Sequence, residues 1–392
     1  MAVRQWSTGR RAVAVLGPLL LCVAISVLLL LKVRAPVGWM GLLLGGWCVW
    51  AGFVYRSWAR WGINGAVILC TLGIAEFLLS KKGIGHGEYV CLNPSHRSYV
   101  AKNDLLGMVP RSNCQVQHHL EDQGTEIFDT VYTIDEHRLR VVVPAGDPSA
   151  ETVVFCGCSY TFGEGVADEE SLPSRVAQLR SDLRVLNFGF HGYGPHQMLA
   201  NLESGRVAQL CPQPPRVVIF QMIPDHVNRV VGWVPYNEHA PRYGWREGRI
   251  ERLGHLDDLF LSRKSRAVLG KSNVFRQLLQ PHLVPHSAVE LTAAVVAQSA
   301  AEVHRQFPEC QFHVVYWIRQ GDKTALAVRQ ALQRHGLKLH VVTELDPALA
   351  ESRFTFPLDG HPTAEAYARL AQRIEETILV PAVGPTPEEP IH

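Results

Sequence analysis

Several features that would indicate nucleic-acid binding or a zinc site are missing from this sequence of 392 residues. The formal net charge is only +2 at pH 7, so the chain has neither a basic field for nucleic acid nor an acidic tail. No two of the nine cysteines have the C-x-x-C spacing, and no zinc-type spacing occurs. The chain also lacks internal repeats and low-complexity tracts. Its length predicts one substantial core with additional elements.

Long uncharged runs, by contrast, fill the N-terminal part of the chain. Residues 12–31 and 35–55 carry no charge, and residues 61–80 carry only Glu76. A helix of about twenty apolar residues spans a hydrocarbon core of about 30 Å. We therefore predict a membrane anchor of three transmembrane helices within residues 1–83. The first run is longer than the h-region of a cleaved signal peptide, and no A-x-A site follows it.

The basic residues around these runs predict the orientation of the anchor. With the N-terminus inside, the cytoplasmic basic residues are Arg4, Arg10, Arg11, Arg56 and Arg60. The external basic residues are then Lys32, Arg34, Lys81 and Lys82. The three arginines ahead of the first run decide this narrow balance, because the first helix usually dominates. We expect everything after Lys82 to lie on the extracytoplasmic side, periplasmic or extracellular.

Two features of the N-terminal third have two interpretations each. Glu76 is costly to bury within a span, which makes a functional role the default hypothesis. It also lies about one turn from Lys81, so its carboxylate can instead reach the membrane interface. An oxidising exterior would permit a Cys91–Cys114 disulfide, whereas reduced, packed thiols fit the sequence equally well.

Beyond the anchor the apolar pattern changes twice. Residues 84–150 are expected to form a β-rich connector, because residues 130–141 alternate in places between apolar and polar. From 151 to 380, β-rich runs alternate with helical ones, which predicts a parallel sheet covered on both faces. The expected strands are 152–156, 184–188, 216–222, 311–318 and 338–343. The expected helices are 172–180, 195–210, 288–306, 323–334 and 363–379.

One long insertion interrupts this alternation at about 225–286. Its aromatic residues lie among Gly, Pro and Arg and are Trp233, Tyr236, Tyr243 and Trp245. The insertion is either a lid or acceptor surface near the site, or a solvated loop with a small cluster of its own. The proline-rich tail, 381–392, is expected to be disordered.

Loops at three strand ends carry groups suited to nucleophilic catalysis. Ser159 follows the first strand, a glycine-rich stretch from Asn187 follows the second, and Asp359 and His361 share a loop before the last helix. A serine nucleophile needs a base, a carboxylate that orients the base, and N–H donors for an oxyanion. Loops after parallel strands meet at one edge of the sheet, where such folds bind ligands. Alone, the Asp-Gly-His stretch is equally explained by a turn and a helix cap.

Together these stretches resemble the SGNH (GDSL-type) hydrolase superfamily, over about residues 152 to 379. Gly157-Cys158-Ser159 matches the first block, with Ser159 as the nucleophile. Asn187 to Gly192 matches the second block, in which Gly192 takes the place of the oxyanion glycine. Asp359-Gly360-His361-Pro362 matches the last block. The resemblance implies a three-layer α/β/α domain. The run after Gly157 lacks the second glycine of G-x-S-x-G, which argues against an α/β-hydrolase elbow.

The chain departs from that superfamily at three places. Cys158 replaces the Asp of Gly-Asp-Ser. In the third block Asp225 matches, but Pro224 occupies the place of the oxyanion asparagine; losing one such donor costs about 10²–10³ in rate in another hydrolase. The residues of this loop considered as substitutes are His226, Asn228 and Arg229. The Asp-x-His spacing resembles that of the O-acetyltransferases that act on envelope polysaccharide and peptidoglycan.

The resemblance predicts a membrane-anchored serine esterase that acts on an acyl ester of an envelope glycan or a lipid-linked sugar. Ser159, His361 and Asp359 would form the triad, and the N–H groups of Ser159 and Gly192 the oxyanion hole. The expected supporting residues are Asn187, Asp225 and His226. No metal or organic cofactor is implied. One alternative is an O-acyltransferase that uses the same acyl-enzyme; the other is a catalytically weak glycan-binding or scaffold protein.

Overall fold

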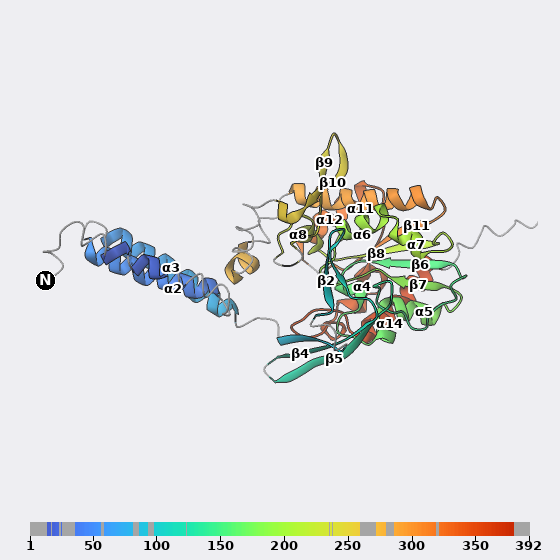
Figure 1. The fold of residues 1–392 in the computed structure, drawn as a ribbon, viewed down its shortest axis with the longest axis horizontal. Coiled ribbons are helices and arrows are strands. Elements are labelled where there is room, and N and C mark those ends of the chain that lie inside the picture. Colours follow the sequence, from blue (N-terminus) through green and yellow to red (C-terminus); the bar gives the residue numbers. More distant parts are fainter. Residues whose placement is uncertain are drawn as a thin grey trace, which may run out of the picture. The chain divides into compact units, whose positions relative to one another are not determined.

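The computed structural model describes residues 14–16, 18–22, 25, 36–55, 59–80, 86–92, 98–122, 124–234, 236, 238–258, 272–279, 286–318 and 321–379. The chain divides into two compact units. One unit comprises Met1–Gly83 and Phe260–Val284, and the other comprises Ile84–Leu259 and Pro285–His392. Figure 1 shows a helical first unit and a mixed second unit of strands and helices.

The first unit is built on two apolar helices, α2 (Pro36–Val54) and α3 (Ala59–Ser80). They approach closely because glycines lie at their contact. A Cβ added to Gly41 would lie 2.7 Å from the carbonyl oxygen of Leu69, and one added to Gly45 would lie 2.6 Å from the Cys70 Sγ. Small residues at such contacts are typical of helices that pack in a lipid environment.

The prediction of three transmembrane helices is corrected by the structure. In the described part of the chain, only α3 is long and apolar enough to cross a membrane, through Gly62–Leu79. The apolar stretch described in the second predicted span is Trp39–Ala51. The first predicted span, 12–31, lies mostly outside the described residues, as does the tail 381–392.

Glu76 is buried on α3, and backbone N–H groups surround its carboxylate. It accepts hydrogen bonds from the N–H of Asn273 at 2.6 Å and of Val274 at 3.1 Å, and also from the hydroxyl of Ser272. All four residues belong to the same compact unit. These donors account for a charge in an apolar helix, because a buried carboxylate is tolerated where hydrogen bonds satisfy it.

The predicted connector, residues 84–150, contains five strands. They are β1 (His86–Cys91), β2 (Val100–Asn103), β3 (Gly107–Pro110), β4 (Cys114–Asp122) and β5 (Thr125–Ile134). β1, β4 and β5 form an antiparallel sheet in the order β1-β4-β5, and β2 pairs with β3. The buried side chains Tyr99 and Tyr132 pack with Phe162 and Phe190 of the sheet domain. The connector therefore shares a hydrophobic core with the segments that follow.

A five-stranded, all-parallel sheet forms the centre of the second unit. Its strands are β6 (Thr152–Cys156), β7 (Arg184–Asn187), β8 (Val217–Met222), β11 (Gln311–Tyr316) and β12 (Lys338–Val341). Their order is β12-β11-β8-β6-β7, and every neighbouring pair is parallel. All five predicted strands are present, and the predicted α/β fold with a parallel sheet is confirmed.

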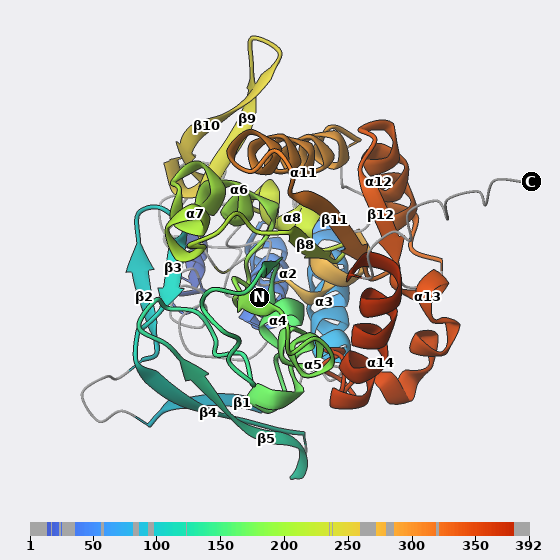
Figure 2. The ribbon, with the colours of Figure 1, turned by 90° about the vertical axis from the view of Figure 1, so that its right-hand side faces the viewer.

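Helices cover both faces of this sheet, as Figure 2 shows. α5 (Leu172–Leu179) and α14 (Ala364–Ile374) pack on the face that carries Val153 and Phe155. On the other face lie α6 (Pro195–Glu203), α7 (Arg206–Leu210), α11 (His286–Gln306) and α12 (Lys323–Arg334). The helix predicted over 195–210 is divided at Gly205, whose φ of 74° interrupts the helical backbone.

The described part of the insertion contains a short helix and a β-hairpin. α8 (His226–Val230) follows β8 directly, and β9 (Pro241–Arg246) pairs with β10 (Arg249–His255). Tyr243 is buried with Leu199 and Val295, whereas Trp245 is 54% exposed toward the hairpin tip. The hairpin thus packs through its base while its tip projects from the body (Figure 1).

Candidate active site

Ser159 lies at the carboxyl end of β6, where the chain turns into the short helix α4 (Ser159–Phe162). Gly157 permits this turn, because a Cβ there would lie 2.1 Å from the Thr161 Oγ1 and 2.9 Å from the Gln221 carbonyl oxygen. Ser159 is only 5% exposed. A serine at the end of a central parallel strand occupies the edge of the sheet where such folds bind ligands.

His361 and Asp359 reach this serine from the loop before α14. The Nε2 of His361 lies 2.7 Å from the Ser159 Oγ, and its Nδ1 lies 2.5 Å from the Asp359 Oδ2. The hydroxyl of Tyr160 donates to the Gly360 carbonyl oxygen at 2.8 Å, which ties the loop to α4. The structure thus joins the predicted nucleophile, base and carboxylate in one hydrogen-bonded path.

The electrostatic surroundings favour the protonated form of His361. Burial by itself lowers the pKa of the His361 imidazole, but the charge of Glu164 and the charge and hydrogen bond of Asp359 outweigh it. The pKa is therefore raised above 6.5. Such an imidazole accepts a proton readily, as a base partnered with a serine must.

The glycine-rich loop after β7 lies beside α4. The side-chain amide of Asn187 donates to the Thr161 carbonyl oxygen at 3.1 Å, and its Oδ1 accepts from the N–H of Gly189 at 3.0 Å. Gly192 has a φ of 71°, which favours glycine. Within the described residues, neither the N–H of Ser159 nor that of Gly192 donates a hydrogen bond to the protein. Both donors are available for an oxyanion.

The predicted third-block residues have other partners in the structure. Asp225 accepts hydrogen bonds from Asn228 at 3.0 Å and from the Nε of Arg229 at 3.0 Å. His226 is fully buried, and its Nδ1 accepts a long hydrogen bond of 3.5 Å from the N–H of Ile223. No contact of Asp225 or His226 with Ser159 occurs among the described residues. Their role is therefore to shape the loop around α8.

Arg229 connects this loop to the glycine-rich one. Its guanidinium donates to the Tyr193 carbonyl oxygen at 2.7 Å as well as to Asp225, and the side chain is only 8% exposed. Burial lowers the pKa of Arg229, but Tyr236, Cys158 and Asp225 raise it more, so the group stays cationic. The buried positive charge of Arg229 is thus hydrogen-bonded to the residue that follows Gly192 in the chain.

Sequence reasoning missed Glu164, which lies beside His361. Its Oε2 is 3.6 Å from the His361 Nε2 and 2.7 Å from the His191 Nδ1. Its Oε1 accepts a hydrogen bond of 2.6 Å from the Tyr89 hydroxyl. The one available signal was a lone carboxylate between two glycines, Gly163 and Gly165, directly after the serine helix.

Arg140 of the connector was also missed, and it holds the loop that carries Glu164. The side chain is buried and donates to the carbonyl oxygens of Phe162, Gly163 and Val166, and to the Asp168 carboxylate at 2.8 Å. Its guanidinium also stacks 4.5 Å from the Tyr132 ring. A single charge from outside the sheet domain thus fixes residues 162–168.

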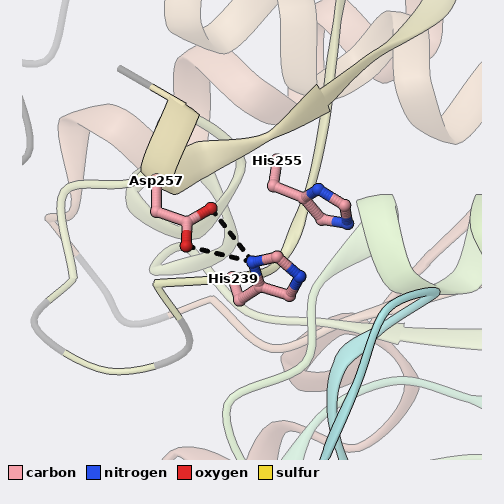
Figure 3. Close-up of side chains that lie close together, drawn as sticks. All are labelled: His239, His255 and Asp257. Carbon is pink, nitrogen blue, oxygen red and sulfur yellow. Dashed lines mark hydrogen bonds and ion pairs between the residues drawn. The ribbon is translucent and has the colours of Figure 1, made fainter. Parts of the chain in front are cut away.

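A cluster of metal-ligating types lies at the base of the hairpin and is drawn in Figure 3. His239, His255 and Asp257 each offer a ligand atom within 4.8 Å of the others. The two imidazoles stack at 3.9 Å, and the His239 Nδ1 lies 3.0 Å from the Asp257 carboxylate. The His255 Nε2 lies 2.7 Å from the Asp104 carbonyl oxygen. These partners satisfy the cluster through hydrogen bonds, and it contacts none of the triad residues.

Comparisons with known proteins give similarity of fold only. No family model and no curated protein sequence matches the chain. Similar solved structures include a member of the lipolytic G-D-S-L family from Veillonella parvula, with 13% identity, a TM-score of 0.35, and coverage of 59% of this chain and 100% of that one. TesA has 14% identity, a TM-score of 0.35, and coverage of 58% and 97%.

A third similar structure is a variant of Axe2, an acetyl xylan esterase from Geobacillus stearothermophilus. Its identity is 14%, its TM-score is 0.34, and the match covers 59% of this chain and 95% of that one. A similar fold at such identities does not carry a substrate with it.

Proposed function

We propose that this protein is a serine esterase of SGNH type that forms an acyl-enzyme at Ser159. The observation that supports the proposal is the path from the Ser159 Oγ through His361 to Asp359, with distances of 2.7 Å and 2.5 Å. Nucleophile, base and orienting carboxylate are the three groups that acyl transfer requires, and here they stand in that order.

The first half of the reaction follows from these positions. The Ser159 Oγ attacks the ester carbonyl carbon while the His361 Nε2 takes the hydroxyl proton. Asp359 accepts the Nδ1–H and stabilises the imidazolium. The N–H groups of Ser159 and Gly192 meet the negative oxygen of the tetrahedral intermediate. His361 then returns its proton to the leaving alkoxide oxygen, the ester C–O bond breaks, and the acyl group remains on Ser159.

Water completes the cycle in an esterase. It attacks the acyl carbonyl while His361 takes one of its protons, and the acid leaves as the Ser159 hydroxyl is restored. In the alternative, an O-acyltransferase, a sugar hydroxyl attacks in place of water. The Asp-x-His spacing supports that alternative. The two activities differ only in the acceptor that enters.

Arg229 is our candidate to replace the donor lost at Pro224. Its guanidinium bonds to Tyr193, which follows Gly192 directly, and so brings positive charge to the oxyanion loop. His226 is fully buried, and Asn228 donates to Asp225. Among the described residues, neither side chain donates a hydrogen bond to that loop. A cation near a developing oxyanion lowers the barrier by electrostatic stabilisation.

The substrate class and the location are further parts of the proposal. An apolar helix of the length of α3 supports a membrane anchor, and the arginines ahead of the first apolar run support an extracytoplasmic active site. An enzyme held there would meet esters of envelope glycans or lipid-linked sugars. The protein would thus work at a membrane surface, with no nucleic acid as partner.

Hydrolysis of p-nitrophenyl acetate by the purified full-length chain tests the proposal. We expect Ser159→Ala and His361→Ala each to lose about 10³-fold or more in kcat/KM, because the members of a triad act as a unit. His335→Ala, at an exposed helix end, is the matched control and should keep full activity.

Adding an envelope glycan acceptor separates the alternatives. Acyl transfer to the glycan at the expense of free acetate would identify an acyltransferase. Turnover that persists in both triad variants would refute the acyl-enzyme. Absence of turnover in a folded wild-type chain would favour the glycan-binding or scaffold role, which the loss of the asparagine at Pro224 motivates.

A further inference from the structure

Glu164 is a second carboxylate beside His361, and the mechanism above leaves it without a role. Its Oε2 lies 3.6 Å from the His361 Nε2, the nitrogen that faces Ser159. Asp359 contacts the other nitrogen. The imidazole therefore lies between two carboxylates, and its side chain is only 15% exposed.

Two neighbours hydrogen-bond to Glu164 in this position, and a third lies close to it. The Tyr89 hydroxyl donates to Oε1 at 2.6 Å, the His191 Nδ1 lies 2.7 Å from Oε2, and the His118 Nδ1 lies 3.9 Å from Oε1. Tyr89 and His118 come from β1 and β4 of the connector, and His191 comes from the glycine-rich loop. The Tyr89 hydroxyl is a neutral donor, so it helps to fix the carboxylate without neutralising it.

The carboxylate is ionised. Burial raises the pKa of Glu164, but the charges of His191 and His361 and the hydrogen bonds from His191 and Tyr89 lower it more, so it lies well below 4.5. A fixed negative charge in a largely buried site acts strongly on a neighbouring imidazole, because little water screens it.

We propose that Glu164 is a positioning residue that stabilises the protonated form of His361 from the Nε2 side. This inference rests on the proposed esterase function. Asp359 orients the ring through Nδ1. Glu164 lies beside Nε2, the nitrogen that takes the proton from Ser159 and later gives it to the leaving group. Glu164 thereby assists the step that creates the imidazolium.

The same contact sets the pH at which the enzyme becomes active. His361 works as a base only when it is neutral, so activity rises with pH as the imidazolium loses its proton. A carboxylate that stabilises the imidazolium moves this rise to higher pH. Other titratable or charged groups also face His361 or Glu164: Asp359, His118, His191, Arg229, Tyr89, Tyr99, Tyr132, Tyr160 and Tyr367.

The decisive variant is Glu164→Gln, which removes the charge and keeps the shape. In the pH profile of kcat/KM, we expect the acidic limb to move about one pH unit lower. We also expect the plateau value of kcat to fall several-fold. Glu169→Gln makes the same charge change at an exposed position five residues along the chain, and should leave the limb in place. Tyr89→Phe removes one donor to Glu164 and should move the limb less than Glu164→Gln.

A readout that needs no activity keeps this proposal separate from the esterase proposal. We would follow the His361 ring nitrogens by NMR in the ¹⁵N-histidine-labelled full-length chain, assigned with His361→Ala. A midpoint lowered by about one pH unit in Glu164→Gln supports the pairing, even if the wild type hydrolyses no ester. An unchanged midpoint overturns the pairing, even if the wild type is an active esterase.

Discussion

Gly192 combines a backbone of positive φ with an N–H that donates no hydrogen bond among the described residues. Both follow from its position in the turn after Phe190, where the N–H of Tyr193 bonds back to the Phe190 carbonyl oxygen at 3.1 Å. A side chain at Gly192 would meet Met108 and Tyr236, each 3.0 Å from an added Cβ. The loop that presents the oxyanion donor is therefore closely packed.

Gly192→Ala should impair catalysis more than stability. The strained backbone and the contact with Met108 would displace the N–H, and loss of one oxyanion donor lowers kcat by about 10²–10³. The measurements are kcat/KM on p-nitrophenyl acetate and the thermal midpoint. The control is Gly205→Ala, where φ is 74° but nothing lies within 4 Å of the added Cβ. Equal activity in the two variants would remove Gly192 from the oxyanion hole.

At the scale of elements, the connector contributes to the candidate site although it lies outside the parallel sheet. β1 supplies Tyr89, β4 supplies His118, and the segment after β5 supplies Arg140. These side chains surround the loop that runs from Phe162 to Asp168. Residues that act on His361 therefore depend on correct pairing of β1 with β4.

Cys91 and Cys114 lie at one end of the β1–β4 pair, and their oxidation state tests in which compartment the domain lies. The Sγ atoms of Cys91 and Cys114 are 3.2 Å apart. Burial, and then the adjacent Cys91 thiol, raise the pKa of Cys114 to about 12, so little thiolate is present at neutral pH and uncatalysed oxidation is slow. In an oxidising compartment, we expect the two thiols to give up two protons and two electrons to its thiol oxidant and form a disulfide.

Peptide mapping of protein taken from cells under acid quench checks this prediction. Cys91 and Cys114 should appear as one linked peptide, while the buried Cys211 and Cys310 stay free and serve as internal controls. If Cys91 and Cys114 are both alkylated as free thiols, the extracytoplasmic placement of this domain is contradicted.

For the whole molecule, buried neutral histidines make the stability of the fold depend on pH. Burial, and then the charge of Arg229, lower the pKa of His196 to about 3 and place that of His226 well below 6.5. The unfolded chain binds protons at both residues near pH 6.5, whereas the folded chain does not. Stability is therefore complete above about pH 6.5 and is lost as the pH falls toward the folded pKa values.

We expect the free energy of unfolding to fall by about 1.4 kcal/mol per pH unit for each such histidine below pH 6.5. Urea unfolding between pH 7.5 and 5 measures this slope in a range where most carboxylates remain ionised. His196→Gln should reduce the slope by one histidine's share, and the exposed His335→Gln should not. A slope that is the same in wild type and His196→Gln would show that His196 is protonated in the fold.

The order of helices and strands was available from the sequence because it depends on local periodicity. β6 and α12 have the predicted bounds, and the other main strands and helices of the sheet domain end within a few residues of prediction. The closeness of Ser159 to the Asp359–His361 loop was also predictable, since loops at one edge of a parallel sheet meet there. Of the three predicted spans, only α3 is long and apolar enough to cross a membrane within the described residues, and the first span lies mostly outside them.

Other features were decided by tertiary structure alone. Tyr89 and Glu164 are 75 residues apart, and Arg140 and Gly163 are 23 residues apart, yet each pair forms a hydrogen bond. The sequence around these residues does not predict the partners. A polar side chain has the same local sequence pattern whether it hydrogen-bonds to water or to another residue. The sequence by itself determined the elements and the place of Ser159 after a strand, whereas the position of Glu164 beside His361 depends on how the connector packs against the sheet.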